Sequence, residues 1–154
     1  MYDSTTSTSY RDKKLCKNNY CYYIVALQKG GRWSSRSNTV CKTPKYFPPV
    51  VPVNSVRTTV LPDGRTYTQW EPYTQVKNID QYIISRVYQG ASEDEYYDIS
   101  DSTGFIDNDK YLTTDKLSYT YTVRVKDHCD EESPKSKVNK TILLTGKSEG
   151  YMAK

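Results

Sequence analysis

The side chains of this 154-residue chain that could carry chemistry are one histidine, four cysteines and three short acidic clusters. His128 could act as a base beside a serine or cysteine nucleophile. It lies, however, in the polar run Lys-Asp-His-Cys-Asp-Glu-Glu, and the sequence has no Gly-x-Ser-x-Gly nucleophile turn. We therefore expect His128 to be a loop residue and the protein not to be an enzyme.

The acidic clusters are Glu93–Glu95, Asp107–Asp109 and Asp130–Glu132. Paired carboxylates can hydrolyse glycosides, but all three clusters fall between expected strands, where such residues commonly form turns. Asp107-Asn108-Asp109 has the oxygen density of a weak calcium site but lacks the spaced loop and terminal Glu of a dedicated one. With a single histidine and no Cys-x-x-Cys there is also no standard zinc set, so we expect no metal and no cofactor.

The elements that position these residues are strands. In Leu117–Val125, four apolar residues alternate with four polar ones: Tyr119, Tyr121, Val123 and Val125 against Ser118, Thr120, Thr122 and Arg124. A period of two indicates a strand with one buried face. No convincing helical period occurs, and Tyr, Val, Ile and Thr dominate the periodic segments, so the predicted fold class is all-β.

The same pattern occurs earlier, at Tyr20–Ala26. The residues that follow also match, with Val40-Cys41-Lys42-Thr43 in the first copy and Val138-Asn139-Lys140-Thr141 in the second. Tyr20 and Val40 are 20 positions apart, and Tyr119 and Val138 are 19 apart. The chain is therefore built from a repeat of roughly 100 residues, a common domain size.

This repeat divides the chain into four parts. Residues 1–44 are predicted to be the C-terminal half of one unit, 45–52 a Pro-stiffened linker, 53–145 a complete unit, and 146–154 the start of a third unit or a tail. The complete unit should contain seven strands: 55–61, 66–70, 80–89, 95–100, 103–106, 117–126 and 136–144. In the third of these, Tyr82, Ile84 and Arg86 share one face. Residues 20–27 and 38–43 should be strands of the first unit, with a hairpin turn at Gly30-Gly31.

Charge is uneven along the chain. Residues 1–50 hold nine Lys/Arg against two Asp/Glu, and residues 51–145 hold eleven against fifteen. The cations are spaced singly rather than clustered with stacking aromatics, so we expect no nucleic-acid partner. No apolar run is long enough to cross a membrane, so the segment is not expected to be transmembrane.

The repeat also predicts a disulfide. Cys21 and Cys41 follow the inward-facing Tyr20 and Val40, so both should face outward on neighbouring strands. In the second copy the matching positions are Thr120 and Asn139, and both cysteines are lost together, as a cross-strand pair predicts. Such bonds persist in oxidising compartments, so we expect extracellular or periplasmic exposure, and of these we favour the cell surface or the outside of the cell.

These residues resemble the fibronectin type III fold, a β-sandwich recognised by pattern. The resemblance rests on Trp70 in the second strand, Leu112 seven residues before Tyr119, the alternating sixth strand, and Ser133-Pro134 before the seventh. It implies a core containing Tyr20, Trp70, Tyr119, Tyr121 and Val123. It also implies that the hydroxyl groups of Tyr119 and Tyr20 bond back to upstream backbone in tyrosine corners.

The sandwich topology would bring Cys16 and Cys129 to the facing ends of neighbouring units, which predicts an interdomain disulfide; two separate thiols are the alternative. Tyr20-Cys21-Tyr22-Tyr23, Asp127-His128-Cys129 and Thr141–Leu144 also resemble repeats in large Bacteroidota cell-surface proteins associated with gliding motility or type IX secretion. That resemblance implies an outer-membrane-associated location.

Together these observations favour a non-catalytic structural or adhesive module, a semi-rigid spacer and protein-interaction scaffold. Its expected partners are neighbouring repeats of the same parent chain and surface or secretion-machinery proteins. The alternative is a carbohydrate-binding accessory segment of a secreted polysaccharide-degrading enzyme, with Tyr73 and Tyr96 as candidate binding-surface residues for an extracellular glycan. Cross-strand packing is the competing interpretation of these two tyrosines.

Overall fold

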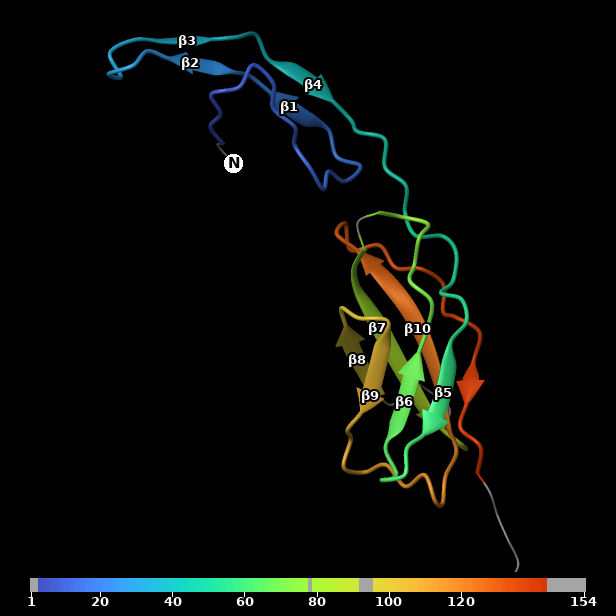
Figure 1. The fold of residues 1–154 in the computed structure, drawn as a ribbon. Helices are drawn as coiled ribbons and strands as arrows, with labels where there is room; N and C mark the ends of the chain where they lie inside the picture. The colour runs from blue at the N-terminus through green and yellow to red at the C-terminus, as the bar shows by residue number, and fades with distance from the viewer. Residues whose placement is uncertain (1–2, 78, 92–95, 144–154) are drawn as a thin grey trace, which may run out of the picture. The chain divides into compact units, whose positions relative to one another are not determined.

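The computed structural model describes residues 3–77, 79–91 and 96–143, with only the backbone of residues 96 and 97. The chain divides between Phe47 and Pro48 into an N-terminal unit and a C-terminal unit, inside the segment predicted as a linker. Figure 1 shows both as assemblies of strands. The described residues contain no helix that is long and apolar enough to cross a membrane. The predicted third unit or tail, residues 146–154, lies outside the described residues.

The C-terminal unit is a sandwich of two antiparallel sheets (Figure 1). One sheet has the order β5-β6-β9, and the other has the order β11-β10-β7-β8. The strands are β5 (Arg57–Val60), β6 (Thr66–Gln69), β7 (Ile79–Tyr88), β8 (Tyr96–Ser100), β9 (Gly104–Asp107), β10 (Tyr119–Asp127) and β11 (Asn139–Lys140). The all-β prediction is confirmed, and seven strands form in this unit close to the predicted positions.

The core lies between the two sheets, where the alternation of β10 places its apolar side chains. Tyr119, Tyr121, Val123 and Val125 are all buried. Trp70 packs edge-on against Tyr82 with ring centroids 5.1 Å apart, a favoured aromatic geometry. The other buried hydrophobic residues are Val53, Tyr73 and Ile84. Aromatic rings thus supply much of the apolar area that a chain with few leucines would otherwise lack.

Two hydrogen bonds of one side chain connect the two sheets at their edges. Asn139 of β11 accepts a hydrogen bond from the Thr58 N–H through Oδ1 (2.8 Å) and donates one from Nδ2 to the Val56 carbonyl (2.7 Å). One amide side chain therefore satisfies two backbone groups near the edge of the opposite sheet.

In the Pro-rich segment, the Tyr73 hydroxyl donates to the Val51 carbonyl at 2.8 Å, and Pro49 is buried. The second half of the predicted linker is thus packed onto the C-terminal unit.

The N-terminal unit is built on one interrupted antiparallel hairpin. Its outgoing side consists of β1 (Tyr20–Tyr22) and β2 (Val25–Leu27), and its returning side consists of β3 (Ser34–Arg36) and β4 (Val40–Lys42). Gly30 and Gly31 have φ of 100° and 74° in the connecting loop, a conformation that glycine adopts at little cost. The sequence predicted the outgoing strand as one element and did not predict β3.

The interruption is a β-bulge. Tyr22 pairs with Val40, whereas the Ser37 N–H donates to the Ile24 carbonyl at 2.9 Å. Two residues, Asn38 and Thr39, therefore lie opposite Tyr23 alone, which is the defining arrangement of a bulge. The extra residue shifts the pairing of the returning strand by one position.

Candidate interaction surface

A polar network is buried at the centre of the C-terminal unit. Arg86 of β7 bonds through one guanidinium nitrogen to the Asp107 carboxylate at 2.7 Å and through the other to Asp109 at 2.6 Å. The Tyr121 hydroxyl donates to the same Asp107 oxygen at 2.9 Å and lies 2.6 Å from the Thr66 hydroxyl. The second Asp107 oxygen accepts the Asp109 N–H at 3.0 Å. The carboxylate of Asp107 is therefore fully used in holding three strands and the following turn together.

The interactions in this network stabilise the charged forms of Arg86 and Asp109. Burial lowers the pKa of Arg86, but hydrogen bonds to Asp109 and Asp107 outweigh it and leave that pKa raised. The same guanidinium lowers the pKa of Asp109. Burial raises the pKa of Tyr121, so the phenol stays neutral. Since Arg86 already supplies the positive charge beside both carboxylates, the network is a structural ion pair. The expectation of no calcium site at Asp107–Asp109 stays a prediction.

The tyrosine corner expected from the sequence is present in both units. The Tyr119 hydroxyl accepts a hydrogen bond from the Thr113 N–H at 3.0 Å. In the N-terminal unit the Tyr20 hydroxyl accepts one from the Cys16 N–H at 3.1 Å. Each tyrosine thus ties the beginning of its strand to the preceding turn. Tyr119 is buried in the core, whereas Tyr20, also predicted to be a core residue, is only half-buried.

A second interaction is repeated in the two units. Tyr22, two residues after the corner tyrosine, donates from its hydroxyl to the Asp12 carboxylate at 2.8 Å, as Tyr121 does to Asp107. The sequence matches these partners, because Tyr10-Arg11-Asp12 corresponds to Phe105-Ile106-Asp107. Hydrogen bonding to Asp12 raises the pKa of Tyr22. The repeat therefore preserves particular side-chain interactions as well as a strand pattern.

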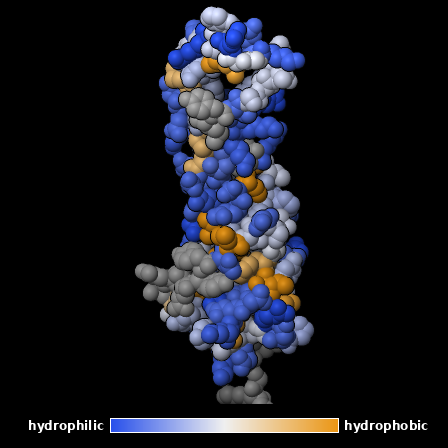
Figure 2. Space-filling model, turned by 90° about the vertical axis from the view of Figure 1, so that its left-hand side faces the viewer, coloured by the Kyte–Doolittle hydropathy of each residue, from blue (hydrophilic) through white to orange (hydrophobic). Residues whose placement is uncertain are grey.

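The surroundings of the two copies differ sharply. Tyr121 is 0% exposed and Val123 is buried beside it, whereas Tyr22 is 40% exposed and Ile24 is 73% exposed. Other large hydrophobic side chains of the hairpin are also exposed: Tyr23, Val25, Leu27, Trp33 and Val40. On the face drawn in Figure 2, hydrophobic residues are interspersed with hydrophilic ones. We call the surface formed by Asp12, Tyr22, Ile24, Ala26 and Val40 the hairpin face.

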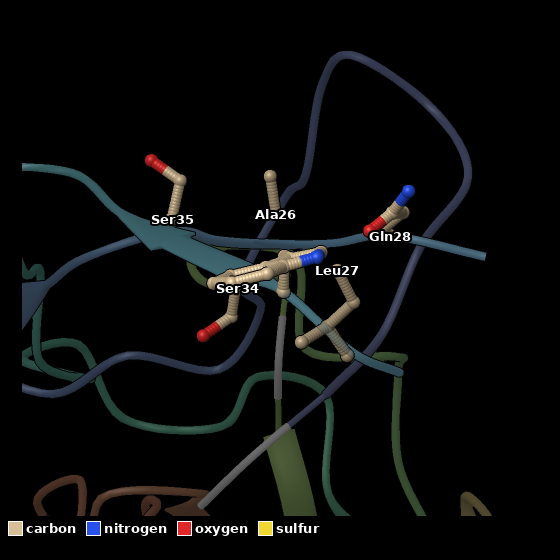
Figure 3. A pocket seen from close by; sticks show the side chains of 6 residues that line it. Ala26, Leu27, Gln28, Ser34 and Ser35 are labelled. Carbon is tan, nitrogen blue, oxygen red and sulfur yellow. The ribbon is translucent and has the colours of Figure 1, made fainter. Parts of the chain in front are cut away.

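Near its tip the hairpin borders a hollow of about 490 Å³ that is wide open to solvent. Figure 3 shows that Ala26 and Ser35 project to one side of the strands, while Leu27 and Ser34 project to the other. The hollow thus extends around both sides of a thin two-stranded ribbon. Such a shape lacks the enclosing walls of a small-molecule site and is better suited to contact with another polypeptide.

The hairpin also carries a disulfide between Cys21 and Cys41, directly opposite each other in β1 and β4. Both residues are exposed. The correspondence inferred for the second unit was wrong by one position. Thr120, the counterpart of Cys21, pairs with Lys140 and not with Asn139. The second unit has the same shift, because the Ser136 N–H donates to the Val123 carbonyl whereas Tyr121 pairs with Asn139. The error therefore comes from matching the similar residues that follow Val40 and Val138, and the structural counterpart of Cys41 is Lys140. The pairing of Cys16 with Cys129 remains a prediction.

The candidate glycan-binding tyrosines do not form a described surface. For Tyr73 the structure excludes the candidate binding role and agrees with the competing interpretation of packing. This residue is buried in the core, where its hydroxyl bonds to Val51 and its own N–H donates to the Tyr82 hydroxyl at 3.0 Å. The nearby hollow bounded by Val51–Pro52 and Glu71–Gln75 has a volume of about 70 Å³, enough for only a few water molecules. Tyr96 lies in β8, but its side chain is outside the described part of the structure.

Comparison with known proteins agrees with this architecture. No protein-family model and no curated protein sequence matches the chain. Among solved structures, it is similar to the FN1–FN3 domains of chicken CNTN1, with a TM-score of 0.50 and 16% identity. That match covers 80% of this chain and 43% of the other, so the chain spans less than half of that structure.

Two further structures are similar. The third fibronectin III domain of the human KIAA0343 protein has a TM-score of 0.48 and 21% identity, covering 66% of this chain and 90% of that one. Domains d3–d4 of the rat CD45 extracellular region have a TM-score of 0.49 and 12% identity, and the match covers 91% of this chain and 72% of that one. The strand order, the tyrosine corner and the CNTN1 match agree on the fold. The C-terminal unit is a β-sandwich of the fibronectin type III kind.

Proposed function

We propose that this chain is a non-catalytic structural and adhesive segment of an extracellular protein, in which it spaces other domains and presents protein-binding surfaces. The observation that carries the proposal is the use made of the buried polar groups. Arg86, Asp107 and Tyr121 bond to one another inside the sandwich instead of lining a cleft. A site for catalysis usually needs convergent polar groups in a concave pocket.

The disulfide supports the extracellular location. Cys21 and Cys41 lie on an exposed two-stranded hairpin, where a reducing cytosol would have ready access to the bond. Disulfides of this kind persist where the surroundings are oxidising. The finer assignment is to a large cell-surface protein of the Bacteroidota, associated with gliding or type IX secretion and with the outer membrane. It is supported by the repeat phrases around Cys21, Cys129 and Ile142 alone.

Surface labelling tests this proposal directly. An antibody raised against the purified chain should label intact cells that produce the parent protein. Peptide mapping of the surface fraction under non-reducing conditions should recover the Cys21–Cys41 bond. Labelling that appears only after permeabilisation, together with reduced cysteines in the cell extract, would contradict an extracellular role.

The second candidate function is carbohydrate binding by an accessory segment of a polysaccharide-degrading enzyme. One observation still favours it: Trp33 and Tyr111 are each 74% exposed, and exposed aromatic rings can stack on sugars. Pull-down with insoluble polysaccharides, comparing the natural chain with Trp33→Ala and Tyr111→Ala, separates the two functions. Saturable binding that either variant abolishes favours the carbohydrate function, and absence of binding favours the spacer.

A further inference from the structure

We infer that the hairpin face is the inner face of an incomplete second sandwich. Its occupant is a segment of the same polypeptide that precedes residue 1 and corresponds to residues 53–95. This occupant brings a cationic side chain to Asp12 and a hydroxyl group to Tyr22. The inference identifies an intramolecular docking surface and the chemistry of its partner, which the proposed function does not require.

The two units match residue by residue at the corner and its neighbours. Tyr20 and Tyr119 form the same corner, and Tyr22 and Tyr121 make the same bond to Asp12 and Asp107. Leu15 and Leu112 both immediately precede the residue whose N–H enters the corner, and both are half-buried. Repeated side-chain hydrogen bonds at matched positions are not expected from a generic hairpin. The N-terminal unit therefore has the local structure of the last strands of a sandwich.

In the complete unit, residues of β6 and β7 cover these groups. There Tyr121 meets Thr66 of β6, and Asp107 meets Arg86 of β7. Residues 3–47 contain β1 to β4 and no strand that corresponds to β6 or β7. Tyr22 and Ile24 are exposed for this reason, although their counterparts Tyr121 and Val123 are completely buried. The missing cover is therefore the part of a sandwich that supplies these two strands.

The carboxylate of Asp12 determines which charge the occupant must bring. In the complete unit, Asp107 is buried only because Arg86 compensates its charge at 2.7 Å, and an uncompensated buried carboxylate would be costly. If the hairpin face is covered in the same way, Asp12 needs a cation from the covering segment. Apolar side chains of that segment would cover Ile24 and Val40, removing large exposed hydrophobic surfaces from water.

Nitration of tyrosines by tetranitromethane, followed by peptide mass spectrometry, tests the inference. Two proteins are compared: the present chain and one extended upstream by the natural residues of the parent, over a length equal to residues 48–95. Extension should slow nitration of Tyr22 by roughly tenfold or more, because reaction would then require local opening. Within the same samples, exposed Tyr111 should react equally in both proteins, and buried Tyr121 should be protected in both.

A pair of substitutions tests the inference without nitration. Asp12→Asn should destabilise the first unit of the extended chain, and Asp115→Asn, at an exposed position, should not. Equal nitration of Tyr22 in the two proteins would overturn the inference, as would a parent chain that begins at Met1. A third outcome would also overturn the inference. If Tyr22 of the present chain becomes more protected as protein concentration rises, and sedimentation shows dimers, then a second copy of the chain occupies the hairpin face.

Discussion

Tyr22 and Tyr121 donate the same hydrogen bond, to Asp12 at 2.8 Å and to Asp107 at 2.9 Å, yet Tyr121 is fully buried and Tyr22 is 40% exposed. The bond therefore forms within the last part of a unit and does not depend on complete burial. What the complete sandwich adds is Arg86, Thr66 and an apolar surrounding. The surroundings of the bond, and not the bond itself, therefore distinguish the two copies of the motif.

Asp107→Asn should strongly destabilise the C-terminal unit. The substitution leaves the Arg86 guanidinium buried with one carboxylate instead of two, and disrupting a buried ion pair costs about 3 kcal/mol or more. Urea unfolding followed by tryptophan fluorescence measures this change. Asp63→Asn is the control, because Asp63 pairs with Arg65 at the exposed surface and its loss should leave the midpoint unchanged. Equal midpoints for the two variants would rule out a structural role for the network.

Tyr119→Phe removes only the hydroxyl of the tyrosine corner. The Thr113 N–H then loses its acceptor, and we expect a loss of about 1 kcal/mol in the free energy of unfolding. Tyr111→Phe is the matched control, since the Tyr111 ring is exposed. The same denaturant titration serves for both variants, and a Tyr119→Phe protein as stable as the natural chain would show that the corner contributes nothing.

Asn139→Ala should weaken the connection between the two sheets. It removes the acceptor for Thr58 N–H and the donor for Val56 carbonyl together, with an expected cost of about 1–2 kcal/mol. Val138→Ala, next in the chain but with an exposed side chain, is the control. Faster amide exchange confined to residues 56–60 would accompany the loss. Unchanged exchange there would mean that the Asn139 bonds are not formed in solution.

The stability of the C-terminal unit should fall at both extremes of pH. The pKa of Asp109 is lowered by Arg86, so the folded state binds fewer protons than the unfolded state, and stability is lost as pH falls below about 5. The pKa of Tyr121 is raised by burial, so stability is also lost as pH rises above about 10. Thermal unfolding measured from pH 3 to 11 shows both limbs.

Two variants assign these limbs. Asp109→Asn should flatten the acid limb, and Tyr121→Phe should flatten the alkaline limb, each at some cost in stability at neutral pH. An acid limb that is identical in Asp109→Asn and the natural chain would locate the responsible carboxylate elsewhere.

The cysteine pairing can be determined without a structure. Non-reducing peptide mapping should recover Cys21–Cys41, and we predict that it also recovers Cys16–Cys129. Cys21→Ser with Cys41→Ser should speed amide exchange within residues 20–42, because a disulfide closing a loop of this length contributes about 3 kcal/mol. Exchange in the C-terminal unit should not change. Recovery of alkylated Cys16 and Cys129 would disprove the second bond.

The fold could be predicted from the sequence because its main signal is local. The alternation in Leu117–Val125 gives a strand with one buried face, and its earlier copy gives the repeat. Arg86 was predicted to share a face with Tyr82 and Ile84, and a cation on an apolar face already indicates a buried partner. Asp107, 21 residues away, could not be identified as that partner, since strand pairing brings the two together.

The errors have physical causes of the same kind. Tyr73 belongs to no periodic segment, and it is buried because residues 49–53 fold back over the core. Cys41 was matched with Asn139 through the similar residues around them, whereas strand pairing places Lys140 opposite Thr120, the counterpart of Cys21. The different spacings of Tyr20 to Val40 and Tyr119 to Val138 were the visible sign of this mismatch, since Asn139 and not Val138 takes the place of Val40 in the pairing.

Amide hydrogen exchange of the intact 154-residue chain tests most directly the claim that one unit is a complete sandwich and the other is not. We predict slow exchange along β7 and β10, at the level of global unfolding, and fast exchange along β1 to β4 despite the matching sequence and the disulfide. Protection of residues 20–42 equal to that of residues 119–127, in a chain shown to be monomeric, would contradict the account.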